Sequence, residues 1–224
     1  MYLIPALLSN DVAELRSVLI KLLPHFTHFQ VDIQDGIFVP SHTLSISEYM
    51  DTIRECAGDQ SVTIDFHLML TEYADALTQI EHIQSAPSLP PGVAYGRSLV
   101  RTTYVHTNIG TDLLSPSTAL TFNPEDRVEE WGGFLKESKY AQVMTIHPGP
   151  QGQTFMPQTL TKIGQIKSIN SDCIVCIDGG VNEESIGFIS SQQALCVPDE
   201  CAVGSYFSRA TVSEMSERIQ KLTS

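Results

Sequence analysis

Two patterns of hydrophobic and polar positions alternate along the chain. Short apolar runs rich in β-branched and aromatic residues predict strands, and stretches with apolar residues three and four positions apart predict helices. The strand pattern occurs eight times, as YLIPALL, HFQVDI, VTIDFHLML, LVRTTYVH, STALTF, AQVMTIH, CIVCID and CAVGSYF. The helical pattern is clearest at 11–23, 45–56, 72–84, 157–169 and 211–222, and Asn10 is expected to cap the first helix.

Alternation of strands and helices is typical of parallel βαβ units. Eight strand candidates in 224 residues, with no linker or shift in composition between them, favour a closed (β/α)8 TIM barrel over an open doubly wound sheet. The sequence therefore predicts an α/β fold in which residues 1–224 form a single domain.

Two connections around the fourth strand depart from the regular alternation. TNIGTDLLSPS, after this strand, is short and contains Gly110 and Pro116, so we expect a single helical turn instead of a full crossover helix. SAPSLPPGVAYGRS, before the strand, is rich in Pro, Gly and Ser and predicts a surface loop.

The composition narrows the classes of partner. Hydrophobic residues make up 42% and charged residues 17% of the chain, which are globular values. With 13 basic and 26 acidic residues the formal net charge is −13, which repels nucleic-acid backbones and anionic lipids. We therefore expect neither a nucleic-acid partner nor a membrane partner.

The N-terminal segment MYLIPALLSN lacks the basic region and the cleavage site of a signal peptide. Five cysteines are an odd number, which fits reduced thiols in a cytoplasmic protein. Cys173 and Cys176 have the C-x-x-C spacing of some redox and metal motifs. Positions three apart on a strand face opposite sides, however, and this disfavours such a role.

Polar residues in the second strand mark the predicted site. The active site of a (β/α)8 barrel is built at the carboxyl ends of its strands. Gln30, Asp32 and Gln34 share one face of the second strand because side chains on a strand alternate. A carboxylate between two amides, in an otherwise apolar strand, is expected to point into the barrel mouth.

The third and seventh strands add further candidates. Asp65, His67 and Met69 share one face of the third strand, and the seventh strand ends in Asp178. Taken singly, a His in an apolar strand is more often a core residue and an Asp before Gly is more often part of a turn. Two carboxylates and a histidine at one barrel mouth would be costly to bury unless their charge served a function. We therefore interpret the set as a functional site.

Glycines follow the sixth, seventh and eighth strands, in MTIHPGPQGQTF, DGG and VGS. Backbone N–H groups at such glycines can bind phosphate without Lys or Arg, and the loops after strands seven and eight are the usual phosphate site of this fold. The expected phosphate-binding residues are Gly149, Gly152, Gly179, Gly180, Gly204 and Ser205.

Five segments together resemble the ribulose-phosphate 3-epimerases: VDIQDGIFVP, DFHLML, VMTIHPGPQGQTF, IDGGVN and AVGSYF. They follow the order, spacing and strand positions of that family, and the resemblance extends from about residue 3 to about residue 220. The related decarboxylases and hexulose-phosphate synthases carry a D-x-K-x-x-D motif, but IDFHLML contains no Lys. The resemblance implies an isomerase, and a homo-oligomer, that epimerises a ketose phosphate such as ribulose 5-phosphate or xylulose 5-phosphate at carbon 3.

By this resemblance, Asp32 and Asp178 are the acid/base pair that removes a proton from one face of carbon 3 and returns one to the other. The resemblance also implies a divalent metal ion (Zn, Fe, Mn or Co), held by Asp32, His67 and Asp178, that stabilises the ene-diolate intermediate. Met69 and Met144 are expected to bind the substrate beside them.

The chain departs from the family pattern at the same site. Gln30 replaces the family's first histidine ligand, and Ala6 replaces a serine of its first strand. Gln30 could bind a hard cation through its amide oxygen, although imidazole is the better ligand for zinc or iron. Two alternatives stay open: a non-catalytic sugar-phosphate-binding barrel, and an isomerase or lyase that shares the ene-diolate. Further departures are Gln34, Ile37, Ser41 and Gln151.

Overall fold

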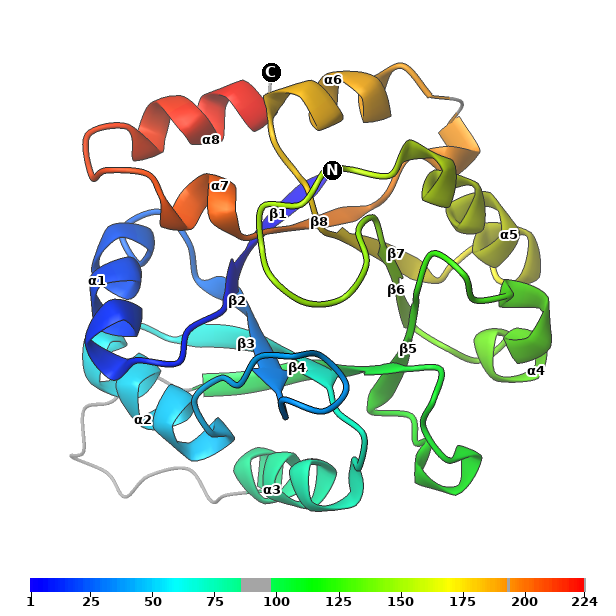
Figure 1. Ribbon diagram of the computed structural model, residues 1–224, viewed down its shortest axis with the longest axis horizontal. Helices are drawn as coiled ribbons and strands as arrows, with labels where there is room; N and C mark the ends of the chain where they lie inside the picture. The colour runs from blue at the N-terminus through cyan, green and yellow to red at the C-terminus, as the bar shows by residue number, and fades with distance from the viewer. Residues whose placement is uncertain (86–97, 193, 224) are drawn as a thin grey trace.

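Eight parallel strands close into a barrel, in which each strand pairs with the next and β8 pairs with β1. The computed structural model describes residues 1–85, 98–192 and 194–223 (Figure 1). The barrel predicted from the apolar runs is confirmed. The strands are β1 (Tyr2–Leu7), β2 (His28–Gln34), β3 (Val62–Met69), β4 (Ser98–His106), β5 (Thr118–Phe122), β6 (Tyr140–Met144), β7 (Ile174–Asp178) and β8 (Glu200–Val203).

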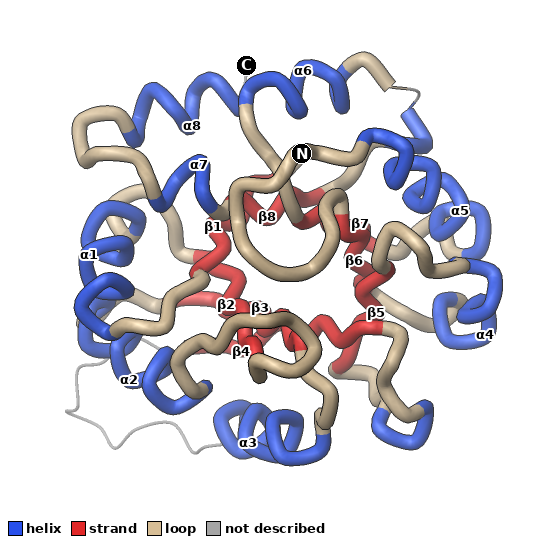
Figure 2. The backbone as a smooth tube through the Cα atoms, viewed as in Figure 1, coloured by secondary structure: helices blue, strands red, loops and turns tan. Residues whose placement is uncertain are grey.

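Helices surround the barrel and cover the outer faces of its strands (Figure 2). They are α1 (Val12–Leu22), α2 (Ile46–Ala57), α3 (Ala74–Ser85), α4 (Gly132–Leu135), α5 (Thr161–Ile169), α6 (Glu183–Ser190), α7 (Ser205–Ser208) and α8 (Met215–Thr223). Single 3-10 turns are η1 (Thr111–Leu113), η2 (Val128–Trp131), η3 (Pro157–Leu160) and η4 (Ala194–Cys196). Among the helices of the described residues, none has the length and apolar character that crossing a membrane requires.

The five predicted helices are present, but the predicted N-cap of the first is wrong. Asp11 caps α1 instead of Asn10, because Asp11 is the last residue with an extended backbone and its carboxylate accepts a hydrogen bond from the Glu14 N–H. The helix predicted at 157–169 begins as the turn η3 and continues as α5.

The eighth strand is shorter than its apolar pattern predicts. It ends at Val203, and the residues that follow Gly204 form the short helix α7. Beyond Val203 the backbone bonds locally, since the N–H groups of Phe207 and Ser208 donate to the Gly204 carbonyl. The loop predicted before the fourth strand falls almost wholly on 86–97, outside the described residues.

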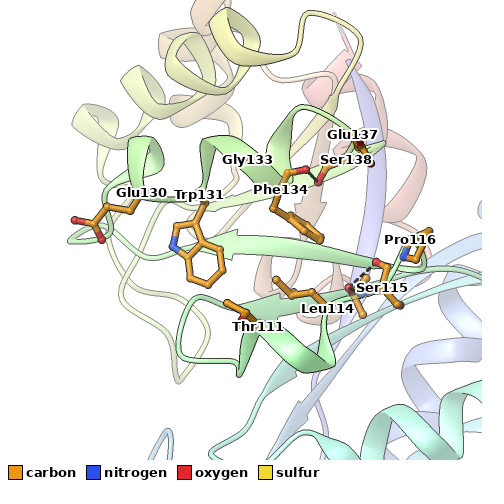
Figure 3. Close-up of a pocket in the computed structure, with 11 residues that line it drawn as sticks. Thr111, Leu114, Ser115, Pro116, Glu130, Trp131, Gly133, Phe134, Glu137 and Ser138 are labelled. Atoms are coloured by element: carbon orange, nitrogen blue, oxygen red, sulfur yellow. Dashed lines mark hydrogen bonds between the residues drawn. The ribbon is translucent and has the colours of Figure 1, made fainter.

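The connection between β4 and β5 contains the single turn η1, as the sequence predicts. Because no full helix covers the barrel here, a groove of about 870 Å³ opens between η1 and α4. Leu114 and Pro116 line one side of this groove, and Trp131 and Phe134 line the other (Figure 3). It lies in the helix ring and, among the described residues, shares no lining side chain with the cavity at the barrel mouth.

Side chains inside the barrel form layers of different chemistry along its axis. At the amino ends of the strands, Arg101 donates from Nε to Asp65 Oδ1 over 2.9 Å and from Nη2 to Glu200 Oε2 over 2.7 Å. His28 Nε2 lies 2.8 Å from the same aspartate. These charges are paired with one another at the amino ends of the strands, apart from the carboxyl end. The next layer holds Ala6, Tyr104, Ala119, Cys176 and Ala202.

The two cysteines of the C-x-x-C pattern point to different sides of the barrel wall. Cys176 packs in the interior layer, whereas Cys173 packs in the outer core between strands and helices. Both are free thiols. The opposite orientation predicted from the strand period is confirmed.

Candidate active site

Strands β2, β3 and β7 bring four polar side chains together at the carboxyl end of the barrel. Asp32 lies beside His67 because β2 and β3 pair in that register, and Asp178 is the last residue of β7. Gln30 lies two residues before Asp32, on the same face of β2. The exposed fractions are 1% for Gln30, 5% for Asp32, 0% for His67 and 9% for Asp178. Residues on the inward faces of β2 and β3 thus lie beside the last residue of β7.

Asp32, His67 and Asp178 form a compact donor set. His67 Nδ1 lies 3.2 Å from Asp32 Oδ1 and 3.1 Å from Asp178 Oδ2. One ligand atom of each residue lies within 4.8 Å of those of the other two. Two carboxylates and an imidazole are ligands that divalent cations accept. These three residues could therefore hold one metal ion.

Burial and neighbouring charge shift the pKa values of these groups. Burial raises the pKa of Asp32, a hydrogen bond with His67 opposes this, and the charge of Asp178 raises it further. Burial lowers the pKa of His67, but the two carboxylates beside it outweigh burial and raise the pKa to about 9. At neutral pH, His67 is therefore an imidazolium held between carboxyl groups. A metal ion would have to displace its proton.

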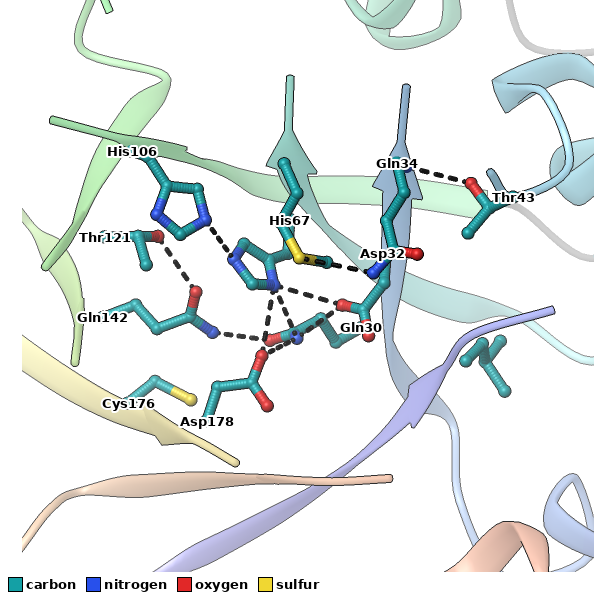
Figure 4. Close-up of polar contacts among 12 residues, drawn as sticks. Gln30, Asp32, Gln34, Thr43, His67, His106, Thr121, Gln142, Cys176 and Asp178 are labelled. Carbon is teal, nitrogen blue, oxygen red and sulfur yellow. Dashed lines mark hydrogen bonds and ion pairs between the residues drawn. The ribbon is translucent and has the colours of Figure 1, made fainter. Parts of the chain in front are cut away.

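The Gln30 side chain presents its amide nitrogen to the carboxylates. Gln30 Nε2 donates to Asp32 Oδ1 over 2.8 Å and to Asp178 Oδ2 over 2.7 Å. Gln30 Oε1 accepts from Gln142 Nε2 over 2.8 Å, and Gln142 Oε1 accepts from the Thr121 hydroxyl over 3.0 Å (Figure 4). Ionised carboxylates only accept hydrogen bonds, so the nitrogen has to face them. The structure thus orients Gln30 as a donor and not as the oxygen ligand that its amide could provide.

A second histidine adjoins the first. His106 Nε2 lies 3.0 Å from His67 Nε2, and its ring packs against Phe38 with centroids 4.7 Å apart. Burial lowers the pKa of His106 well below its usual value, and the charge of His67 lowers it further. Neutral His106 therefore accepts a hydrogen bond from the His67 imidazolium and holds its ring in place.

The predicted site residues border one small cavity of about 30 Å³, roughly the volume of a single water molecule. The segment 145–156, after β6, curves over the barrel mouth (Figures 1 and 2). The lining includes Asp32, His67, Met69, Met144, Gly149, Gly152, Asp178, Gly179, Gly180, Gly204 and Ser205. Of the predicted site residues, Gln30 is buried beneath this cavity and does not line it.

Gln151 closes one side of the cavity. Its amide lies so close to Gly204 that a Cβ at residue 204 would come within 2.4 Å of Gln151 Nε2. A side chain at residue 204 would therefore have to displace the Gln151 amide. The departure at Gln151 therefore narrows the site just where the predicted phosphate-binding glycines lie.

The other departures from the family pattern differ in their distance from the centre. Gln34 Nε2 lies 3.4 Å from the Gly149 carbonyl, and Gln34 Oε1 accepts from the Ser41 hydroxyl over 2.7 Å. These contacts join the loop after β2 to the loop after β6. Ala6 lies in the barrel interior, whereas Ile37 is 78% exposed and points to solvent.

Gln142 and Thr121 are site residues that the sequence analysis missed. Both are fully buried, on β6 and β5. A signal was present for the first, because Gln142 is two positions before Met144 and so shares its inward face. Thr121 carries no such signal, since threonine is common in strands.

A comparison with known proteins places this geometry in context. Residues 2–203 match the model of the ribulose-phosphate 3 epimerase family. The chain belongs to this family. Members of this family are isomerases. The site residues Asp32, His67 and Asp178 of this chain lie within the matched region.

Named relatives agree with the family. The cytoplasmic isoform of ribulose-phosphate 3-epimerase from Oryza sativa subsp. japonica is 25% identical over 223 residues, covering 97% of this chain and 92% of the relative. Ribulose-phosphate 3-epimerase from Mycobacterium leprae is 26% identical, covering 81% and 78% of the two chains. The Helicobacter pylori (strain 26695) enzyme is 26% identical, covering 81% of each.

Solved structures of other barrels share only the fold. Orotidine 5′-phosphate decarboxylase from Pyrococcus horikoshii superposes with a TM-score of 0.56 at 12% identity, covering 99% of both chains. A tryptophan synthase complex from Pyrococcus furiosus gives 0.61 at 13% identity, covering 99% of this chain and 97% of the other. At such identities these likenesses support the (β/α)8 architecture and nothing about the reaction.

Proposed function

We propose that this protein epimerises a phosphorylated ketose at carbon 3, with ribulose 5-phosphate and xylulose 5-phosphate as the first candidates. One observation carries the proposal: the carboxylates of Asp32 and Asp178, from β2 and β7, face a single point beside His67. Inversion of a carbon centre through a planar intermediate needs acid/base groups on both faces, and this pair can flank one atom.

The reaction follows from the acidity of the carbon-bound proton. This proton lies next to the ketone, so its removal gives an ene-diolate that can be protonated again from either face. One of Asp32 and Asp178 takes the proton, and the other, in its protonated form, delivers one to the opposite face. Burial raises the pKa of Asp32, which makes it a stronger base than a solvent-exposed carboxylate.

A divalent ion held by Asp32, His67 and Asp178 would supply electrostatic stabilisation for the negative charge of the ene-diolate. Without a metal ion, imidazolium His67 donates to both carboxyl groups instead and keeps them oriented. The phosphate of the sugar would bind to backbone N–H groups around Gly179, Gly180 and Ser205, at the edge of the same cavity. A sugar phosphate is larger than this cavity, so we expect Gln151 and its loop to move on binding.

The test is exchange of the carbon-3 proton with deuterated water, followed by NMR. Ribulose 5-phosphate and several hexulose phosphates are incubated with the protein, with and without Fe²⁺, Zn²⁺, Mn²⁺ or Co²⁺. We expect exchange, and we expect Asp32→Asn and Asp178→Asn each to slow it by at least about 10²-fold. Asp51→Asn, at an exposed carboxylate of α2, is the matched control and should leave the rate unchanged.

A second candidate is a sugar-phosphate-binding protein without catalysis, and the donor orientation of Gln30 favours it. This reading predicts that phosphosugars bind but that no proton exchanges with any sugar or metal. Exchange that persists in both aspartate variants would contradict the proposed acid/base pair itself.

A further inference from the structure

Three ligand atoms of the candidate metal centre converge on an atom of the protein itself. Gln30 Nε2 lies 2.8 Å from Asp32 Oδ1, 2.7 Å from Asp178 Oδ2 and 3.4 Å from His67 Nδ1. Two of these contacts are hydrogen bonds to carboxylates, which are stronger than bonds between neutral groups. The partly positive N–H2 group thus lies where the two carboxylates direct their lone pairs, beside the third ligand atom of the centre.

We propose that the Gln30 amide competes with a divalent cation for the two carboxylates, so that Gln30 is a positioning residue that weakens the metal affinity of the centre. The N–H2 group holds Asp32 and Asp178 together, as a cation would. A cation can bind fully only when this amide turns away. The inference rests on the proposed function only in treating Asp32, His67 and Asp178 as the metal ligands.

The partners of Gln30 resist that turn. If Gln30 Oε1 faced the centre, Gln30 Nε2 would face Gln142 Nε2, and two donors would then meet. Gln142 would have to turn as well, which would direct its own Nε2 at the Thr121 hydroxyl. All three side chains are at most 1% exposed, so water cannot replace a lost partner. The amides therefore have to reverse together or not at all.

Gln30→Leu removes the amide without adding a charge. The variant therefore shows whether the amide competes with the cation or coordinates it. Binding of Co²⁺, Zn²⁺ and Mn²⁺ is measured by calorimetry on chelator-treated protein, without sugar. We expect Gln30→Leu to bind about tenfold tighter than the wild type or more, because the carboxylates lose their internal donor. We expect Gln30→His to bind tighter still, because imidazole adds a fourth ligand.

Gln34→Leu is the matched control. It removes another buried amide from the same face of β2, but Gln34 contacts Met69 and Gly149 and not the carboxylates. Its metal affinity should equal that of the wild type. Weaker binding in Gln30→Leu would mean that the amide oxygen is a ligand, and equal binding would mean that the amide has no influence. Either result overturns the proposal.

One further measurement keeps the test valid if Gln30→Leu folds poorly, and another supports it if the variant folds. In wild-type protein with ¹⁵N-labelled glutamine side chains, saturating Zn²⁺ should shift the N–H2 signals of both Gln30 and Gln142, while an unmoved Gln30 signal would refute the competition. In Gln30→Leu that does fold, cations should raise the melting temperature more than in the wild type. Neither readout needs a sugar, so absence of epimerase activity would leave this inference untouched.

Discussion

At the scale of single residues, the acceptor-only carboxylates of Asp32 and Asp178 set the direction of the buried amides. Gln30 Nε2 donates to them, Gln142 Nε2 donates to Gln30, and the Thr121 hydroxyl completes the chain by donating to Gln142 Oε1. Thr121 is 0% exposed, so its hydroxyl is the donor that satisfies this buried oxygen.

Replacement of Thr121 tests this role. Thr121→Val keeps the shape of the side chain but leaves Gln142 Oε1 buried without a donor, so we expect the free energy of unfolding to fall by about 1–3 kcal/mol. Thr121→Ser keeps the hydroxyl and should lose less. Denaturant unfolding measures both changes, and a loss in Thr121→Val no larger than that in Thr121→Ser would show that the hydrogen bond contributes no more than the methyl group.

At the scale of elements, a charged layer ties three strands together at the end opposite the site. Arg101 of β4 bonds to Asp65 of β3 and to Glu200 of β8 across the barrel interior. Asp65 shares a strand face with His67, yet its charge is paired with Arg101 in this layer. Two residues of separation along β3 therefore divide a structural carboxylate from a functional histidine.

Arg101→Met should strongly destabilise the fold. It leaves two buried carboxylates without their cation, and loss of one partner of a buried pair costs about 3–5 kcal/mol of unfolding free energy. Arg16→Met is the control, because the side chains of Arg16 and its partner Glu55 are 38% and 62% exposed and the melting temperature should change little. A loss in Arg101→Met no larger than in Arg16→Met would mean that water reaches the layer.

At the scale of the whole molecule, the excess of acidic residues acts on stability. A net charge of −13 makes the folded chain repel itself, and salt screens this repulsion. We expect the melting temperature at pH 7 to rise by roughly a few degrees between low and physiological salt. Near the isoelectric point of about 4.8 the rise should disappear, and a rise of equal size there would have another cause. The homo-oligomer implied by the family resemblance stays a prediction.

Local pattern by itself determined the architecture and much of the site. Eight apolar runs predicted the strands, because a buried strand needs a continuous apolar segment whatever its neighbours. The two-residue period then placed Asp32, His67 and Met69 on inward faces, because alternation is a property of one strand. The end of the seventh strand added Asp178, and the loops after the sixth, seventh and eighth strands added the glycines of the phosphate site.

Only the tertiary structure decided how those side chains meet across the barrel. Gln30 and Gln142 lie 112 positions apart, and their contact depends on closure of the barrel, which no single strand encodes. The amide direction depends on two carboxylates that come from β2 and β7, and the contact with Gln142 passes it on to β6, so it is a property of the whole chain of hydrogen bonds. The same reason applies to Gly204. The sequence predicts a strand there, but strand pairing ends at Val203 and Gly204 precedes the helix α7. A pattern along the chain predicts which face of its strand a side chain occupies, but only the fold determines which residues that side chain contacts.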